Sequence, residues 1–248
     1  MELHFSGRRA LILGGSCDLA IILAEYLIKA ALLPILTYRD ERGQRHISEK
    51  LLSLTGKHNS FYLNFGDRDS LDSLFEQIDY DIDFLVDFAQ GDFESYVASA
   101  DEDSAHRYFA ENISFRAQII KRASRAMLKK KKGRLIFVSS SAAVRPNPGQ
   151  GFYAAAKLAS EALYRNLGLE LSERGITTVT LRPGYIDSGR GERYMQIREK
   201  EGLKMMPTKR ILTGSEVAET ILFLLSDSAS GFNATEICMD GGQIKGKY

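Results

Sequence analysis

The sequence has few of the residues that bind metals or form disulfides. Its 248 residues include two cysteines, Cys17 and Cys238, and four histidines that share no ligand spacing. Two distant cysteines make neither a disulfide framework nor a zinc cluster. A chain of this length can also bury most of its apolar surface without disulfides. We therefore expect no metal site and no need for an oxidising compartment.

The sequence also lacks a charge imbalance and a long hydrophobic run. Lysine plus arginine number 33 against 32 acidic residues, so nothing draws the chain generally to nucleic acid or to anionic membranes. No stretch approaches 18 uninterrupted apolar residues, and the first residues lead into a strand pattern without the features of a secretory leader. We expect a cytoplasmic protein with no nucleic-acid or membrane partner.

Short apolar runs alternate with longer helical patterns along the whole chain, which is typical of βαβ units and a parallel sheet. No repeat, linker or break in composition marks a second domain. We therefore predict an α/β fold: one domain over residues 1–248, with a Rossmann-like, doubly wound parallel sheet of about seven strands. The strands are expected at Arg9–Leu13, Leu33–Tyr38, Ser60–Asn64, Ile82–Ala89, Gly133–Ser139, Thr177–Leu181 and Thr235–Met239.

One segment interrupts the alternation. Residues 188–209 are rich in charge and glycine and follow the sixth expected strand, where an α/β sheet binds its ligand at the carboxyl ends of its strands. We predict a mobile substrate lid here. Its methionines, Met195, Met205 and Met206, would suit a flexible apolar substrate, or they could belong to the core.

The clearest chemical signal is Tyr153-Ala154-Ala155-Ala156-Lys157, with Ser140 thirteen residues before the tyrosine. On a helix this spacing puts Tyr153 and Lys157 on one face, one turn apart. A tyrosine pKa of about 10 is too high for proton transfer near neutrality. A neighbouring cation lowers that pKa and makes the phenol a usable acid and base. Such pairs are also common on ordinary helices, so the surrounding sequence has to support this interpretation.

A second signal follows the first expected strand. Gly14 and Gly15 lead through Ser16 and Asp18 into a helix expected at Leu19–Lys29. Small residues allow the main chain to approach a pyrophosphate, and a helix N-terminus offers free N–H groups and a positive dipole end. A tight turn alone would use the same glycines. Asp18 brings negative charge to an anion site, or it caps the helix.

Together these features resemble the short-chain dehydrogenase/reductase family over nearly the whole chain. The family's Ser and Tyr-x-x-x-Lys fall on Ser140, Tyr153 and Lys157, and its helix-four asparagine falls on Asn112. Its Pro-Gly-x-Ile-x-Thr corresponds to Pro183-Gly184-Tyr185-Ile186-Asp187-Ser188. The resemblance implies a ketoreductase in which Tyr153 passes a proton to a carbonyl oxygen, Ser140 hydrogen-bonds that oxygen, Lys157 holds the nicotinamide ribose, and Asn112 anchors a water relay.

The sequence departs from the family mainly in its first half. The family's Asn-Asn-Ala-Gly becomes Asp87-Phe88-Ala89-Gln90, its later loop glycines become Asp18 and Ala20, and an adenine-side aspartate becomes Asn64. We expect cofactor binding to survive these changes, and Gln90 has no explanation in the sequence. The cofactor-binding residues implied by the resemblance are Gly14, Ser16, Asp18, Leu19, Arg39, Asn64, Phe65, Ala89, Tyr153, Lys157, Pro183, Gly184 and Ile186.

The choice of cofactor depends on the end of the second strand. A carboxylate there would bind the ribose hydroxyls of NAD and repel a 2′-phosphate. The position holds Tyr38, followed by Arg39, whose guanidinium can take a phosphate bidentately. We therefore expect NADP(H), with NAD(H) as the alternative if Arg39 is simply solvated.

The resemblance implies a small carbonyl compound as substrate, and three interpretations of the function stay open. The pattern is most similar to 3-oxoacyl-acyl carrier protein reductases, with Lys129–Lys132 and Arg174 as a docking surface for the acidic carrier or as a solvated face. A ketone of a sugar, polyketide or other metabolite is the second reading, and a non-catalytic dinucleotide sensor or scaffold is the third. An enoyl reductase is disfavoured, because its tyrosine would stand at Gln150.

The resemblance also implies a homotetramer or homodimer. Such assemblies are built on two long helices, which we expect at Ser104–Met127 and Gly151–Glu173. The alanines of the second helix are small enough for close contact with another helix, or they pack internally. They are Ala154, Ala155, Ala156, Ala159 and Ala162.

Overall fold

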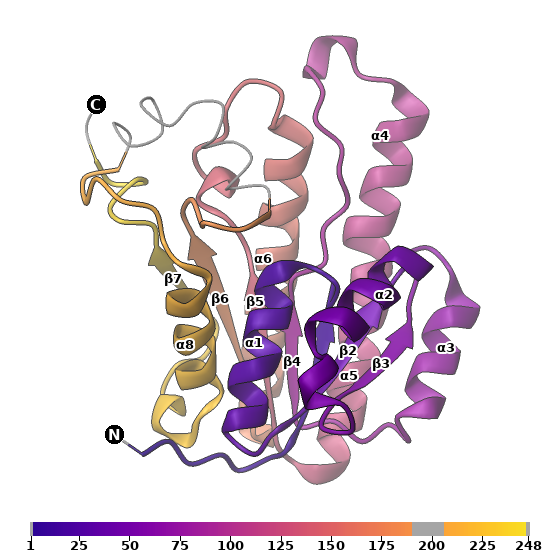
Figure 1. Ribbon diagram of the computed structural model, residues 1–248. Helices are drawn as coiled ribbons and strands as arrows, with labels where there is room; N and C mark the ends of the chain where they lie inside the picture. Colours follow the sequence, from indigo (N-terminus) through magenta and orange to yellow (C-terminus); the bar gives the residue numbers. More distant parts are fainter. Residues whose placement is uncertain (1, 190–205, 247–248) are drawn as a thin grey trace.

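A computed structural model describes residues 2–189 and 206–246 (Figure 1). It confirms the predicted α/β fold: every neighbouring pair in the seven-stranded sheet is parallel, and the strand order is β3-β2-β1-β4-β5-β6-β7. The strands are β1 (Arg9–Leu13), β2 (Leu33–Tyr38), β3 (Asn59–Tyr62), β4 (Phe84–Asp87), β5 (Gly133–Val138), β6 (Ile176–Pro183) and β7 (Thr235–Met239).

Helices cover both faces of the sheet because its strands are apolar on both sides. The α-helices of the described residues are α1 (Asp18–Lys29), α2 (Glu41–Lys50), α3 (Arg68–Gln77), α4 (Glu102–Phe109), α5 (Arg116–Lys130), α6 (Gly151–Leu171) and α8 (Gly214–Leu225). In β1, Ala10 and Ile12 pack in the core under α1 and α8, which lie side by side in Figure 1. Leu11 and Leu13 point to the opposite core, under α3, α5 and α6.

Three strands end earlier than expected, since the chain leaves the sheet to form the site: the fifth, expected at Gly133–Ser139, ends at Val138. The third strand, expected at Ser60–Asn64, ends at Tyr62, and the fourth, expected at Ile82–Ala89, ends at Asp87. Beyond Asp87 the main-chain N–H of Ala89 donates to the Asp87 carboxylate at 3.0 Å, so local bonds replace strand pairing. Apolar runs alone do not reveal such turns.

The long helix expected over Ser104–Met127 is present, from Glu102 to Lys130, but a π-helical segment interrupts it. α4 ends at Phe109, a π-helical segment spans Ala110–Phe115, and α5 continues to Lys130. π-Helical turns are frequent at functional sites, and this one contains Asn112. The second long helix, α6, ends at Leu171, two residues before the expected Glu173.

None of the described helices combines the length and apolar character needed to cross a membrane. Within the same residues, no three His, Cys, Asp or Glu side chains gather in a way that could hold a metal ion.

The strand order positions the site. The chain runs outward from β1 to β3 in one direction and from β4 to β7 in the other, so the order reverses between β1 and β4. In open parallel sheets, ligands bind at such a reversal, beyond the carboxyl ends of the strands. The residues that follow β1, β2, β3 and β4 meet there.

Candidate active site

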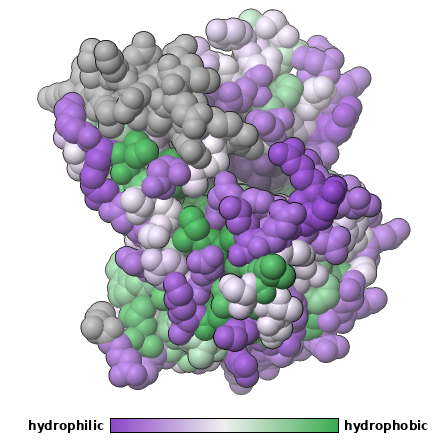
Figure 2. Space-filling view, in the orientation of Figure 1, coloured by the Kyte–Doolittle hydropathy of each residue, from purple (hydrophilic) through white to green (hydrophobic). Residues whose placement is uncertain are grey.

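A cavity of about 340 Å³ opens beyond the carboxyl ends of β1 to β4. Its volume lies within the range of small-molecule sites. Figure 2 shows hydrophilic residues over α2, which follows directly on the cavity wall at Arg39 and Asp40. Predicted cofactor-binding residues that lie in the wall are Gly14, Ser16, Arg39, Asn64, Phe65 and Ala89.

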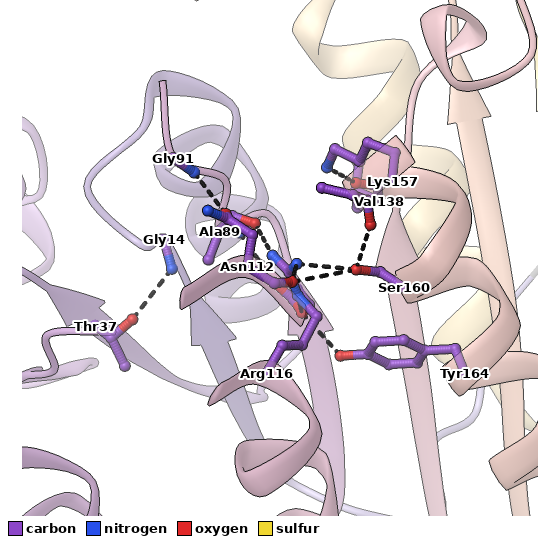
Figure 3. A network of polar contacts seen from close by, with 12 residues as sticks. Gly14, Thr37, Ala89, Gly91, Asn112, Arg116, Val138, Lys157, Ser160 and Tyr164 are labelled. Atoms are coloured by element: carbon purple, nitrogen blue, oxygen red, sulfur yellow. Dashed lines mark hydrogen bonds and ion pairs between the residues drawn. The ribbon is translucent and has the colours of Figure 1, made fainter. Parts of the chain in front are cut away.

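Gly14 shapes the floor of this cavity. Its φ angle is +68°, and a Cβ placed there would lie 2.9 Å from the main-chain nitrogen of Ala89. Its own N–H donates to Thr37 Oγ1 at 3.1 Å (Figure 3). A glycine is therefore required on both grounds, conformation and space. The result is a side-chain-free surface next to the start of α1, which fits the pyrophosphate of a dinucleotide.

Asp18 and Leu19 lie outside the wall of the cavity. The alternative that Asp18 caps the helix is wrong, because Cys17 is the N-cap and Asp18 is the first helical residue. The Asp18 carboxylate lies 2.9 Å from His46 Nε2 of α2, which offsets its charge when the imidazole is protonated. The Leu19 side chain is buried in the core, so this residue can offer only its main-chain N–H to a phosphate.

Tyr153 and Lys157 lie one turn apart in α6, as their spacing predicted. The Lys157 ammonium is 5.8 Å from the centre of the Tyr153 ring and 4.8 Å from that of Phe137. It donates to the carbonyl oxygen of Val138 at 2.8 Å, and the residue is only 2% exposed. A cation held this close in a poorly solvated place favours the phenolate form of the tyrosine.

Ser140 reaches the same edge of the sheet from β5. It is the N-cap of a 3₁₀ turn at Ser141–Ala143, and its Oγ accepts a hydrogen bond from the Ala142 N–H at 3.1 Å. That bond uses the oxygen as an acceptor, so the hydroxyl proton can still be given to a substrate oxygen.

Asn112 is buried and its side chain is held by the main chain on two sides. Its Oδ1 accepts from the Gly91 N–H at 2.8 Å, and its Nδ2 donates to the Tyr108 carbonyl at 2.9 Å. Its own carbonyl accepts from Arg116. The side chain thus joins the loop after β4 to the π-helical segment.

The predicted residues after β6 lie at the same edge of the sheet but outside the wall of this cavity. Pro183 ends β6, the Gly184 N–H donates to Met239 at 2.9 Å, and Ile186 bridges Leu212. Most of the predicted lid, including Met195 and Met205, falls outside the described residues. Met206 is described, and it is buried.

Sequence reasoning left the role of Gln90 unexplained and missed two further residues, Glu111 and Arg116. Gln90, which had no explanation, lines the cavity and donates through Nε2 to the Tyr108 hydroxyl at 2.5 Å. Glu111 also lines it, and Arg116 forms a buried ion pair with Asp87 beneath it. The one available signal was an aspartate ending an apolar strand, which needs a buried partner.

The sequence is similar to a known protein family and to several known enzymes. The family model described as "Enoyl-(Acyl carrier protein) reductase" matches residues 19–243. The 3-oxoacyl-[acyl-carrier-protein] reductase FabG of Salmonella typhimurium is 30% identical over 97% of this chain and 98% of its own length.

Solved structures agree with the fold. A "short chain dehydrogenase/reductase family protein" superposes with a TM-score of 0.86 at 24% identity, over 98% of this chain and 99% of that one. NAD⁺-bound xylitol dehydrogenase superposes with a TM-score of 0.85 at 21% identity, over 96% of this chain and 99% of that one. The family match spans most of the sequence, and the chain belongs to the short-chain dehydrogenase/reductase family.

Proposed function

We propose that this short-chain oxidoreductase is an NADP(H)-dependent ketoreductase that acts on 3-oxoacyl thioesters. The observation that carries the proposal is the placement of Tyr153 over the buried ammonium of Lys157 in α6. Ser140 stands at the end of the neighbouring strand. These are the parts that a proton transfer to a carbonyl oxygen requires.

The mechanism assigns one task to each side chain. When bound, the nicotinamide supplies the hydride for the carbonyl carbon. The Tyr153 hydroxyl donates its proton to the carbonyl oxygen, and the Ser140 hydroxyl hydrogen-bonds that oxygen as its charge develops. Lys157 stabilises the phenolate that remains and would hold the nicotinamide ribose. Asn112 fixes the loop at Gly91 and, in this proposal, anchors the water relay that returns the proton.

The preference for NADP(H) is proposed from Arg39. Its side chain is 72% exposed and lies in the cavity wall, with the Asp40 carboxylate 3.9 Å away. At this distance the ion pair is weak, so the guanidinium can turn to a 2′-phosphate. Pro183, Gly184 and Ile186, beyond β6, are proposed to contact the nicotinamide end.

We propose the substrate from the names of the relatives, several of which are 3-oxoacyl-[acyl-carrier-protein] reductases. We also propose an acyl carrier protein as partner, docking on Lys129–Lys132 and Arg174. These residues precede β5 and β6, so they lie at the edge of the sheet opposite Ser140. A six-residue strand spans about 20 Å.

We also propose a homotetramer or homodimer, formed on the outer face of α6. Ala154 and Ala156 pack internally, but Ala155 and Ala162 are exposed and leave room for another helix. Leu158 and Leu169 on the same helix are 42% and 63% exposed. A monomeric mass in solution by light scattering would contradict this part of the proposal.

We propose the cytoplasm as the compartment. Cys17 and Cys238 are both free and exposed, as is usual for proteins of reducing compartments.

The decisive experiment measures NADPH oxidation with a short 3-oxoacyl thioester, beside NADH and beside Tyr153→Phe. We expect turnover with NADPH that is lost in the variant, while NADPH binding is retained. NADPH binding without thioester turnover would redirect the search to sugar, polyketide or other ketones. Failure to bind either cofactor would contradict the proposal and favour a non-catalytic role.

A further inference from the structure

A fully buried ion pair lies beneath the candidate active site, and the proposed chemistry gives it no role. Arg116, in the first turn of α5, places its Nε 2.8 Å from Oδ2 of Asp87, the last residue of β4. Neither side chain is exposed at all. Desolvating two charges costs several kcal/mol per ion, so such a pair is a poor way to stabilise a fold.

The other donors of Arg116 reach the main chain on both sides of the site. Its terminal nitrogens donate to the carbonyl oxygens of Asn112 and Ala89, and one also donates to Ser160 Oγ at 3.0 Å (Figure 3). Ala89 belongs to the cavity wall, and Asn112 to the predicted catalytic set. A planar guanidinium fork can hold several acceptors in fixed directions, which an ammonium cannot.

Both oxygens of the Asp87 carboxylate accept hydrogen bonds, just as all three side-chain nitrogens of Arg116 donate them. Asp87 Oδ1 accepts from the Ala89 N–H at 3.0 Å, and Oδ2 accepts from the Tyr164 hydroxyl at 2.9 Å. Burial, together with the Asp87 carboxylate, raises the pKa of Tyr164 well above its usual value, so the phenol stays a donor. The ion pair with Arg116 therefore explains why this position holds an aspartate and departs from the family pattern.

Arg116 is also connected by packing to the proton-transfer pair. Its guanidinium lies 5.3 Å from the centre of the Phe137 ring, against which the Lys157 ammonium packs as well. Ser160 lies three residues after Lys157, on the same side of α6. A shift of Arg116 would displace Phe137 and Ser160, which both lie next to Lys157.

We propose that Arg116, with Asp87 as its counter-ion, is a positioning residue that fixes the main chain at Asn112 and Ala89 in the geometry that the reaction needs. The inference rests on the proposed function for its catalytic part. Its structural part concerns the order of two main-chain segments, residues 88–92 and 108–116, and does not depend on any substrate.

The test compares Arg116→Met with the double variant Asp87→Asn/Arg116→Met. The single variant leaves a buried carboxylate without its cation and should lose thermal stability. The double variant removes both charges and keeps one acceptor oxygen where Asp87 offers two, to Tyr164 and Ala89, so it should regain part of the lost stability. We nevertheless expect its kcat to stay at least about tenfold below wild type, since small misplacements at a site are costly. KM for the ketone should change by less than about twofold.

Arg134→Met is the matched control. Arg134 is another buried arginine, bonded to the main-chain carbonyls of Leu224 and Ser226 at 2.8 and 2.6 Å, but it lies at the start of β5, far from the site. Its loss should lower the melting temperature and leave kcat unchanged. Arg116→Lys, which keeps the charge and loses the fork, replaces the methionine variants if these do not fold, with the same expected loss of kcat.

Amide hydrogen exchange supplies a readout that is independent of turnover. Exchange in segments 88–92 and 108–116 should rise in Arg116→Lys, which leaves Asp87 and its bond to the Ala89 N–H unchanged, and stay at the wild-type level in Arg134→Met. Unchanged exchange there, or a stable double variant with wild-type kcat, would overturn the inference. If the wild-type protein reduces no ketone, the proposed function fails, and the exchange comparison still decides whether Arg116 holds these segments.

Discussion

Asp18 introduces a negative charge at the helix end where a dinucleotide's phosphates are expected. Its carboxylate is 2.9 Å from His46 Nε2, so the histidine can offset part of this charge. Helix N-termini favour anions by about 0.3–1 kcal/mol. The carboxylate therefore helps α1 and competes with the cofactor for the same positive end.

This competition predicts that removal of the Asp18 charge strengthens cofactor binding and weakens helix α1. Asp18→Asn should bind NADPH about two- to fivefold more tightly while α1 becomes slightly less stable. Fluorescence titration with NADPH and thermal unfolding would measure the two effects. His46→Gln leaves the carboxylate without its partner and should weaken binding. Weaker binding in Asp18→Asn would mean that the carboxylate itself contacts the cofactor.

Gly14 offers a second test at the level of single residues. Gly14→Ala adds a methyl group 2.9 Å from the Ala89 nitrogen and forces a left-handed conformation on alanine. The control is Gly56→Ala, because Gly56 has a similar φ of +79° with open space around it. Both variants should lose about 1–2 kcal/mol from the conformation. Only Gly14→Ala should also raise the Kd for NADPH, by tenfold or more, and equal Kd values would show that the cofactor does not use this turn.

At the scale of elements, helix α8 carries a complete capping box. Thr213 Oγ1 accepts from the Glu216 N–H at 3.1 Å, and Glu216 accepts from the Thr213 N–H at 2.8 Å. Hydrogen bonding to the Arg210 guanidinium lowers the pKa of Glu216 to about 2. The start of α8 is thus held by a carboxylate that stays ionised in mild acid.

The expected pH dependence follows from the direction of this shift. The folded-state pKa lies below the unfolded value of about 4.3, so the stabilisation from Glu216 is complete above that pH. It is lost as the pH falls toward 2. Glu216→Gln should therefore be less stable than wild type at pH 6, and the difference in melting temperature should shrink between about pH 4 and pH 2. A constant difference would contradict the shifted pKa.

The α4–α5 region shows what sequence periodicity misses at this scale. The apolar pattern over Ser104–Met127 predicts one continuous helix, and the π-helical segment at Ala110–Phe115 does not disturb it enough to be seen. The interruption depends on bonds made by Asn112 and Arg116 to residues far away in sequence. Such bonds are tertiary and leave no local signature.

At the scale of the whole molecule, binding of the cofactor should raise the melting temperature. A ligand at 100 times its Kd adds about 2.7 kcal/mol, which for a chain of this size raises the melting temperature by roughly 5–10 °C. We expect NADPH to produce a larger rise than NADH at equal concentration. Arg39→Ala should remove the difference by lowering the NADPH effect. Equal effects in the wild-type protein would contradict the proposed cofactor preference.

Much of the molecule could be predicted from its sequence because local patterns encode it. The bounds of β1, β2 and β7 agree exactly, since apolar runs between turn residues define them. The four-residue spacing of Tyr153 and Lys157 fixed their relation through helix geometry alone.

The partners of buried polar groups could not be predicted in this way. Asp87 pairs with Arg116, which lies 29 residues further along the chain. Gln90 donates to Tyr108, which lies 18 residues further along. These pairings exist only once the sheet has brought β4 beside the helices that follow it.

The strand order gives the two halves of the chain different parts of the site. Residues after β1 to β4 form the cavity, and the residues that we propose for proton transfer, Ser140, Tyr153 and Lys157, follow β5 or lie within α6. Mutations after β5 that spare the proposed nicotinamide contacts, Lys157, Pro183, Gly184 and Ile186, can thus retune which ketone is accepted without disturbing the cofactor. Such modularity makes the scaffold evolvable, and directed evolution toward new ketones would do best to begin its libraries after Gly133.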